Sequence, residues 1–226
     1  MQEEVTKHSR KIFKTLKNPI HTVSEKVKEI IIEIFIIVFA VSLSIWLHGW
    51  SEHRHEQKEA DKFLKELKED LNADIKLLEE NKNNASRLHH DYKFMLSLKK
   101  NQATDSLVGS HSNFSLLGTT FNIGRYEGFK SSGKIGTIED DKLKNKILTY
   151  YQQTIPNLIS RVNFINTEQL KIMDTDAGNF ALYDFYTTQK MQSKYFNLQY
   201  NINTLIAGYE EAIKQVSTII ESETNN

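Results

Sequence analysis

The hydrophobic pattern of the chain is dominated by one largely apolar run, Ile30 to Trp50, in which Glu33 is the only charged residue. As a helix with a rise of 1.5 Å per residue, this run covers about 31 Å, which matches the hydrocarbon core of a bilayer. The run is rich in β-branched residues, but it is far too long for one strand, so its length favours a helix. It predicts a transmembrane helix at residues 29–50, with Trp46 and Trp50 at the level of the lipid headgroups.

Beyond this run, apolar positions recur three and four residues apart, which is the spacing of amphipathic helices. One stripe extends to about residue 100, a second covers about 138–175 and a third about 190–222. Their members are Leu64, Leu67, Leu71, Ile75, Leu78, Ala85, Leu88, Tyr92 and Met95; Leu143, Ile147, Tyr150 or Tyr151, Leu158, Val162, Ile165 and Ile172; and Leu198, Ile202, Leu205, Tyr209, Ile213, Val216 and Ile220. We therefore predict an all-α protein, in which a single N-terminal transmembrane helix continues into an antiparallel bundle of three long helices plus short helices.

Turn-forming residues divide the first stripe from the second. Residues 101–123 are polar and contain Gly and Ser, so they are expected to form a loop with one short turn of helix. A short helix should follow from Tyr126 to Ser132, and Gly133 should end it in the left-handed conformation. Thr137 is expected to cap the helix of the second stripe.

Three further positions should disturb the long helices. Pro156 has no N–H group and should kink the second one. Residues 176–179 contain Asp, Gly and Asn and should end it. In the first helix, Asn81 and two neighbouring asparagines mark a point where the helix could bend.

The charges that flank the apolar run predict its orientation. Residues 9–28 carry six basic residues and one acidic residue, whereas residues 51–70 carry five basic and seven acidic residues. Because basic flanks stay in the cytoplasm, we predict a cytoplasmic tail at residues 1–28 and an extracytoplasmic helical domain at residues 51–226. In a bacterium this domain would lie in the periplasm, anchored in the inner membrane. A cleaved signal peptide is disfavoured, because both the charged lead and the apolar run are too long.

Composition removes several classes of function. The net charge is zero, so the chain has no basic surplus to attract nucleic acid. It has no cysteine, which excludes disulfides, thiol catalysis and zinc–thiolate sites. The three histidines His48, His53 and His55 spread around a helix axis and do not converge as metal ligands must. We predict no catalytic residue, no metal site and no cofactor.

One segment, Gly128 to Lys134, fits the first seven positions of the phosphate-binding loop GxxxxGK[ST]. The eighth position is Ile135, which cannot ligate magnesium, and no buried strand precedes the segment. A corner between two helices explains the same glycines. The segment is still a candidate anion site, because backbone N–H groups at a helix start attract phosphate or carboxylate. The candidate ligand-binding residues are Tyr126, Lys130, Ser131, Ser132, Gly133 and Lys134.

A second candidate surface lies on the transmembrane helix itself. Glu33, Ala40 and Ser44 fall on one helical face, and the small pair Ala40 and Ser44 would let two helices approach closely. This face predicts self-association within the bilayer. The residues predicted for membrane association are Glu33, Ala40, Ser44, Trp46 and Trp50.

Four features together resemble a known family. The apolar run ends in Trp-x-Glu-x-Arg at Trp50, and the Leu-rich charged segment KFLKELKEDLNADI follows. Further on, Tyr-Glu-x-Phe-Lys-Ser-Ser-Gly begins at Tyr126, and a tyrosine pair follows at Tyr150 and Tyr151. These features are similar to those of an uncharacterised family of single-pass membrane proteins from Bacteroidota. The chain departs from that family at Gly128 and at His48-Gly49, and the resemblance implies an architecture but no activity.

The sequence thus predicts a membrane-anchored envelope protein without catalytic activity, acting in scaffolding, docking or sensing. Its expected partners are the lipid bilayer and either another protein or a second copy of the chain. The alternative is a periplasmic sensor of an anion or small ligand, or an enzyme, that uses the corner from Lys130 to Lys134.

Overall fold

The structure is a computed structural model that describes residues 6, 7, 10, 23–99, 104–112, 115–174 and 182–224. Most of the predicted tail at residues 1–28 and the predicted break at 176–179 lie outside the described residues. The chain divides into two compact units, Met1–Glu59 and Ala60–Asn226, which are described separately. The regular secondary structure of the described residues is entirely helical, which confirms the all-α prediction.

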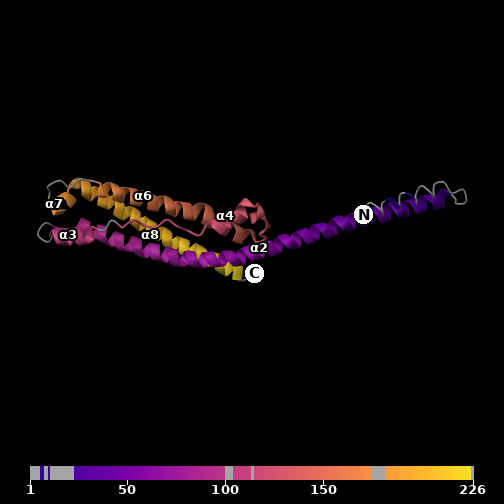
Figure 1. The fold of residues 1–226 in the computed structure, drawn as a ribbon, viewed down its shortest axis with the longest axis horizontal. Coiled ribbons are helices and arrows are strands. Elements are labelled where there is room, and N and C mark those ends of the chain that lie inside the picture. Colours follow the sequence, from indigo (N-terminus) through magenta and orange to yellow (C-terminus); the bar gives the residue numbers. More distant parts are fainter. Residues whose placement is uncertain are drawn as a thin grey trace. The chain divides into compact units, whose positions relative to one another are not determined.

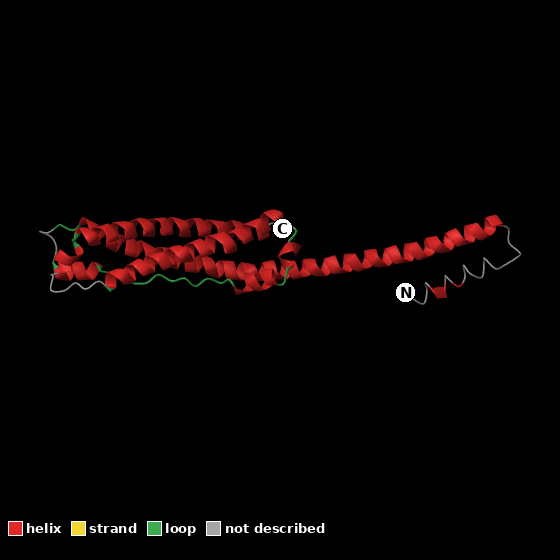
Figure 2. Cartoon of the chain, turned by 90° about the horizontal axis from the view of Figure 1, so that it is seen from above, coloured by secondary structure: helices red, strands yellow, loops and turns green. Residues whose placement is uncertain are grey.

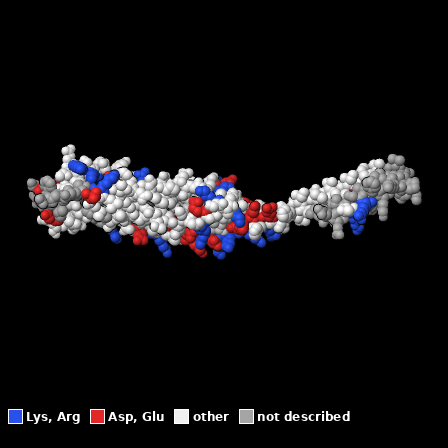
Figure 3. Space-filling model, turned by 45° about the horizontal axis from the view of Figure 1, so that its top comes forward, with Lys and Arg blue, Asp and Glu red and all other residues white. Residues whose placement is uncertain are grey.

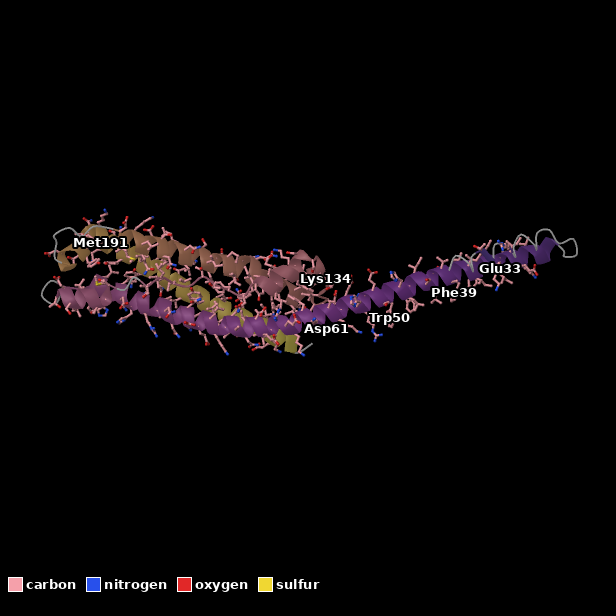
Figure 4. All side chains as sticks on the ribbon, in the orientation of Figure 1. Glu33, Phe39, Trp50, Asp61, Lys134 and Met191 are labelled. Atoms are coloured by element: carbon pink, nitrogen blue, oxygen red, sulfur yellow. The ribbon has the colours of Figure 1, made fainter. Side chains whose placement is uncertain are left out.

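The first unit contains the N-terminal part of α2, a helix of 75 residues that spans Val23–Ser97. Most of the large apolar side chains between Ile31 and Trp50 are exposed, and Phe39 retains 57% of its surface. The core helix of a soluble protein would bury such residues, whereas a helix in lipid would not. Among the described residues, α2 is long and apolar enough to cross a membrane. Phe39 and Trp50 project from this part of α2 in Figure 4.

In the second unit, three long helical segments lie side by side (Figures 1 and 2). They are α2 from Ala60 onward, the succession α5 (Asp141–Thr149), η2 (Tyr150–Thr154) and α6 (Ile155–Met173), and α8 (Gln189–Thr224). Short elements join them: α3 (Asp105–His111), α4 (Gly124–Ser131), the 3-10 turn η1 (Lys134–Thr137) and α7 (Leu182–Tyr186). The helix α2 is continuous through Asn81, where the sequence indicated a weak point.

The core of this unit is formed by the three predicted stripes. Leu67 and Leu71 from α2, Val162 from α6 and Leu205 and Val216 from α8 belong to one buried apolar cluster. Each buried side chain of this size contributes about 1.5–3 kcal/mol of transfer free energy. The hydrophobic pattern therefore places the helices correctly, because burial of one face is what holds amphipathic helices together.

The second long segment corresponds to the helix predicted for about 138–175, but it begins at Asp141 and contains a π-helical turn. Its N-cap is Asp140, whose carboxylate accepts hydrogen bonds from the N–H groups of Lys142 and Leu143. The prediction that Thr137 is the cap is therefore wrong, and Thr137 lies in η1, where its hydroxyl bonds the carbonyl of Lys134. Asp140 suits the cap because its short side chain reaches the free N–H groups of the first turn.

The segment η2 is a π-helical turn, which the sequence did not predict. The N–H of Ile155 donates to the carbonyl of Tyr150, five residues earlier instead of four. Pro156 follows directly, and its ring would clash with the carbonyl four residues back in a regular α-helix. The wider turn therefore accommodates Pro156, the residue expected to kink this helix.

Residues 115–123 form a segment without regular secondary structure, here called the strap, which returns from the α3 end of the bundle to α4 (Figure 2). The side-chain amide of Asn166 on α6 pairs with the backbone of Leu117 through two hydrogen bonds, of 2.9 Å to its N–H and 3.0 Å to its carbonyl. Leu117 and Phe121 turn their side chains into the core. The strap is thus held by both polar and apolar contacts.

Candidate functional site

The most unusual group in the second unit is Asp74, a carboxyl group on α2 with no exposed surface. It lies three residues after Leu71 and four before Leu78, which are both buried, so its position in the sequence is that of a core residue. Sequence reasoning assigned the neighbouring Ile75 to the stripe and missed Asp74. The spacing Leu71-x-x-Asp74-x-x-x-Leu78 is the signal that could have found it.

Hydrogen bonds from two other elements satisfy this carboxyl group. The hydroxyl of Tyr150 in η2 donates to Oδ2 over 3.0 Å. Asn122 of the strap donates to Oδ1 from its side-chain amide over 3.1 Å and from its backbone N–H over 3.4 Å. Asp74 therefore ties α2, η2 and the strap together at one point inside the bundle.

Burial sets the protonation of this group. Loss of solvent raises the pKa of Asp74 above its ordinary value, and the hydrogen bonds from Tyr150 and Asn122 offset part of that rise. The nearby carboxylate of Asp70 adds a further small rise to the pKa. Ionised Asp74 is thus disfavoured in the folded protein, as expected for a buried carboxyl group that pairs with no cationic side chain of the described residues.

Three tyrosines surround this point. The rings of Tyr126 and Tyr151 stack with centroids 4.3 Å apart and planes 7° apart, and Tyr150 meets Tyr151 edge-on at 4.9 Å. The amide of Gln152 donates to the hydroxyl of Tyr126 over 2.7 Å. Burial, followed by the charge of Asp74, raises the pKa of both Tyr150 and Tyr151, so these phenols stay protonated. A protonated, buried phenol can donate a hydrogen bond but is a poor base or nucleophile.

The helix α4 is fixed onto α2 by a cation and an aromatic ring. The guanidinium of Arg125 donates to the backbone carbonyl of Glu66 and lies 3.5 Å from Asp70 and 3.7 Å from Glu69. Phe129 stacks on Phe63 of α2, with ring centroids 3.9 Å apart. Much of the Tyr-Glu-x-Phe segment noted in the sequence therefore serves to attach this corner to the bundle.

The predicted ligand-binding residues lie together at that corner, but in different environments. Tyr126 is buried in the tyrosine stack, while Ser131 is exposed. The ammonium group of Lys130 is 3.8 Å from the carboxylate of Glu127 and 5.7 Å from the ring centre of Tyr126. Lys134 is half-buried at the start of η1 (Figure 4).

The backbone of the corner is a helix C-terminus. Gly133 has φ 77°, the left-handed conformation predicted for it. The N–H of Ser132 donates to the carbonyl of Gly128, and the N–H of Gly133 donates to that of Lys130. The hydroxyl of Ser132 bonds the carbonyl of Phe129. These donors serve the turn itself, so they are not free to bind an anion in this arrangement.

The residues predicted for membrane association all lie on α2 in the first unit. Trp46 and Trp50 are exposed, at 64% and 52%, and the guanidinium of Arg54 is 4.9 Å from the ring centre of Trp50. Ala40 is also exposed and Ser44 is half-exposed, whereas Glu33 retains only 5% of its surface. An indole with an adjacent arginine is a typical arrangement at a bilayer surface.

The charged side chains at the surface are mixed in sign. On the face shown in Figure 3, acidic and basic side chains are mixed over the bundle, in agreement with the zero net charge. Among the described residues, no group of three or more His, Asp or Glu side chains could hold a metal ion. His55 pairs with Glu59 at 3.7 Å, one turn along the same helix. The arrangement around Asp74 can fix the register of three elements, but its carboxyl group is closed to a substrate.

Comparison with protein families gives one match. Residues 33–207 match DUF6090, a family of unknown function, so the match covers most of the apolar run, α4, the tyrosine pair and about half of α8. Comparison with curated proteins and with solved structures found no match. Since the match covers most of the chain, the chain belongs to the DUF6090 family of unknown function.

Proposed function

We propose that this protein is a membrane-anchored docking protein of the bacterial envelope, whose helical bundle holds a protein partner beside the membrane and carries out no catalysis. The observation that carries the proposal is the exposure of most of the large apolar side chains between Ile31 and Trp50 on α2. A face of this kind is stable in lipid and would cause aggregation in water.

The charge pattern supports a defined orientation. The basic flank before the apolar run favours a cytoplasmic N-terminus, and the mixed, slightly acidic flank after it favours a periplasmic bundle. The sequence resemblance to Bacteroidota proteins would make this membrane the inner membrane of such a bacterium.

The apolar interior of the bundle supports a docking role. Its interior is a continuous apolar cluster, and the buried polar group at Asp74 is fully used by Tyr150 and Asn122. A helix that belongs both to the apolar run and to the bundle could carry a tilt or rotation from one to the other when a partner binds. The face with Ala40 and Ser44 could pair two copies of the chain in the bilayer.

Insertion into the membrane can be tested with one substitution and its control. Val38→Arg places a charge in the apolar run and should lower insertion by about 2.5–3.5 kcal/mol, so that alkaline carbonate releases part of the protein. Ala73→Arg adds the same charge to an exposed position of α2 in the second unit and should leave the protein in the membrane fraction. Release of the unmodified protein by carbonate would show that the run does not span.

Orientation and docking need separate measurements. A C-terminal alkaline phosphatase fusion should be active and a C-terminal green fluorescent protein fusion should be dark, because the first folds only outside the cytoplasm and the second only within it. Chemical crosslinking in native membranes, followed by mass spectrometry, should then identify a stoichiometric neighbour attached to the bundle. A correctly oriented protein without any stoichiometric neighbour, including a second copy, would refute docking while leaving the anchor in place.

A further inference from the structure

A groove of about 470 Å³ lies between α6 and α8 on the surface of the second unit. One of its ends is closed by a hydrogen bond of 2.7 Å from the hydroxyl of Thr154, the last residue of η2, to the side-chain carbonyl of Gln215 on α8. Because the helices are antiparallel, the groove then runs toward Arg161 on α6 and Gly208 on α8. Its volume falls in the range of sites that hold small molecules.

The two helices approach each other closely beside the groove, at Gly208 on α8. A Cβ atom built there would lie 3.1 Å from Cδ2 of Leu158, which forms the floor of the groove. Glycine inside a long helix costs about 1 kcal/mol relative to alanine, so it needs a local reason. Here it lets α8 approach Leu158 closely.

Two opposite charges line this space, one on each helix. Arg161 is exposed, and no acidic side chain of the described residues forms an ion pair with it. Glu211 lies on α8, where one of its oxygens accepts a weak hydrogen bond of 3.5 Å from Gln215. The other residues that line the groove are neutral, and Asn157 and Ser160 place an amide and a hydroxyl beside Arg161 on α6.

We propose that this groove binds a small zwitterion, an amino acid or a short peptide. The carboxylate of the ligand would accept two hydrogen bonds from the guanidinium of Arg161, and the ammonium group of the ligand would face the carboxylate of Glu211. A ligand with carboxylates alone would be repelled by Glu211, and a ligand with amines alone would be repelled by Arg161. Asn157 and Ser160 would supply the additional hydrogen bonds that select among zwitterions. The site is independent of the proposed docking role, since it needs neither a membrane orientation nor a protein partner.

Calorimetric titration of the full-length protein in lipid nanodiscs tests this proposal. The probes are the twenty standard amino acids, dialanine and trialanine, compared with N-acetylalanine amide, which lacks both charges, and with succinate, which has two carboxylates. We expect saturable binding of at least one zwitterion with one site per chain, and no binding of the two comparison compounds. Binding of single amino acids without the peptides, or the reverse, identifies which source of the zwitterion the groove selects.

Substitutions then assign the site. Arg161→Gln and Glu211→Gln should each weaken binding by about tenfold or more, as expected when one charged partner is lost. Arg87→Gln is the matched control, because Arg87 on α2 is also exposed and has no ion-pair partner among the described residues, and it should leave the affinity unchanged. Failure of every zwitterion to bind, equal binding of succinate, or equal affinity of Arg161→Gln and the unmodified protein would overturn the proposal.

Discussion

The hydroxyl of Tyr150 donates a hydrogen bond of 3.0 Å to Oδ2 of Asp74, which lies 76 positions earlier in the chain. Both side chains are fully buried, and they join α2 to the π-helical turn η2. A buried carboxyl group is tolerated only when donors satisfy it, so this pair fixes how the two helices align along their length. Apolar contacts alone would permit more than one alignment.

Loss of this hydrogen bond should be costly. Tyr150→Phe removes the donor and leaves a buried carboxyl oxygen without it, so we expect the free energy of unfolding to fall by about 1–3 kcal/mol. Tyr209→Phe is the matched control, because the hydroxyl of Tyr209 is buried without a hydrogen-bond partner among the described residues. That change should cost less than about 0.5 kcal/mol or stabilise slightly. Urea unfolding in non-ionic micelles, followed by circular dichroism, measures both, and equal losses would contradict the role given to Tyr150.

The pH dependence of the free energy of unfolding should reflect the raised pKa of Asp74. Its pKa is higher in the folded protein than its ordinary value of 3.8, so the folded state binds this proton more tightly than the unfolded state does. Burying the ionised group lowers the free energy of unfolding, and this loss is largest above the folded pKa of Asp74. The loss disappears as pH falls through that pKa toward 3.8.

Asp74→Asn isolates this effect because it keeps the shape but cannot ionise. The difference in unfolding free energy, unmodified protein minus variant, should increase as pH is lowered from about 8 to about 4. Unfolding curves of both proteins at a series of pH values provide the measurement. A difference that stays constant, or that decreases toward low pH, would contradict the predicted direction of the shift.

Two glycines near the α4 corner should respond to alanine with opposite signs. Gly133 has φ 77°, so Gly133→Ala forces a side chain into the left-handed region and should cost about 1–2 kcal/mol. Gly128 lies within α4, and a Cβ there would meet nothing within 4 Å. Gly128→Ala should therefore stabilise the protein by about 0.5–1 kcal/mol through its higher helix propensity. Melting temperatures that shift in the same direction for both variants would refute this account of the corner.

Removal of the Asn166 side-chain amide should weaken the attachment of the strap to α6. Asn166→Leu abolishes both hydrogen bonds to the backbone of Leu117, so the Leu117 N–H should exchange with deuterium at least about fivefold faster. Asn163→Leu is the control, because Asn163 is exposed on the same helix and its side chain makes no hydrogen bond that the structure describes. Hydrogen exchange read by mass spectrometry over residues 115–123 distinguishes the two. Unchanged exchange in Asn166→Leu would show that the apolar side chains alone hold the strap.

The sequence was sufficient to predict the helices that bury an apolar face. The stripes through Leu67, Val162 and Leu205 are periodic over many turns, and such periodicity depends little on tertiary context. The left-handed conformation of Gly133 can also be predicted from sequence, because a glycine directly after a short helix is a local signal. The sequence pattern does not identify the cap, because both Thr137 and Asp140 precede the helix and their spacing alone does not decide between them.

The polar centre was harder to predict than the helices around it. Asp74 occupies a core position, but its burial is possible only because Tyr150 and Asn122 arrive from segments far along the chain. Long-range pairing of this kind leaves no periodic trace in the sequence. The candidate groove depends likewise on Gly208 and Leu158 meeting across two helices, which no local pattern reveals.

The π-helical turn has a consequence for how this protein can change in length. It contains one residue more than the α-helical turn it replaces, and both Tyr150 and Tyr151 are buried before Ile155, the next buried position. The extra residue is taken up within the wider turn, so α5 and α6 both keep an apolar face buried on either side of it. Deleting one residue at this turn would convert it into an α-helical turn and leave both faces in place, whereas deleting one residue inside α6 would turn the rest of that helix by about 100°. Homologues should therefore differ by one residue at this turn more readily than within α5 or α6.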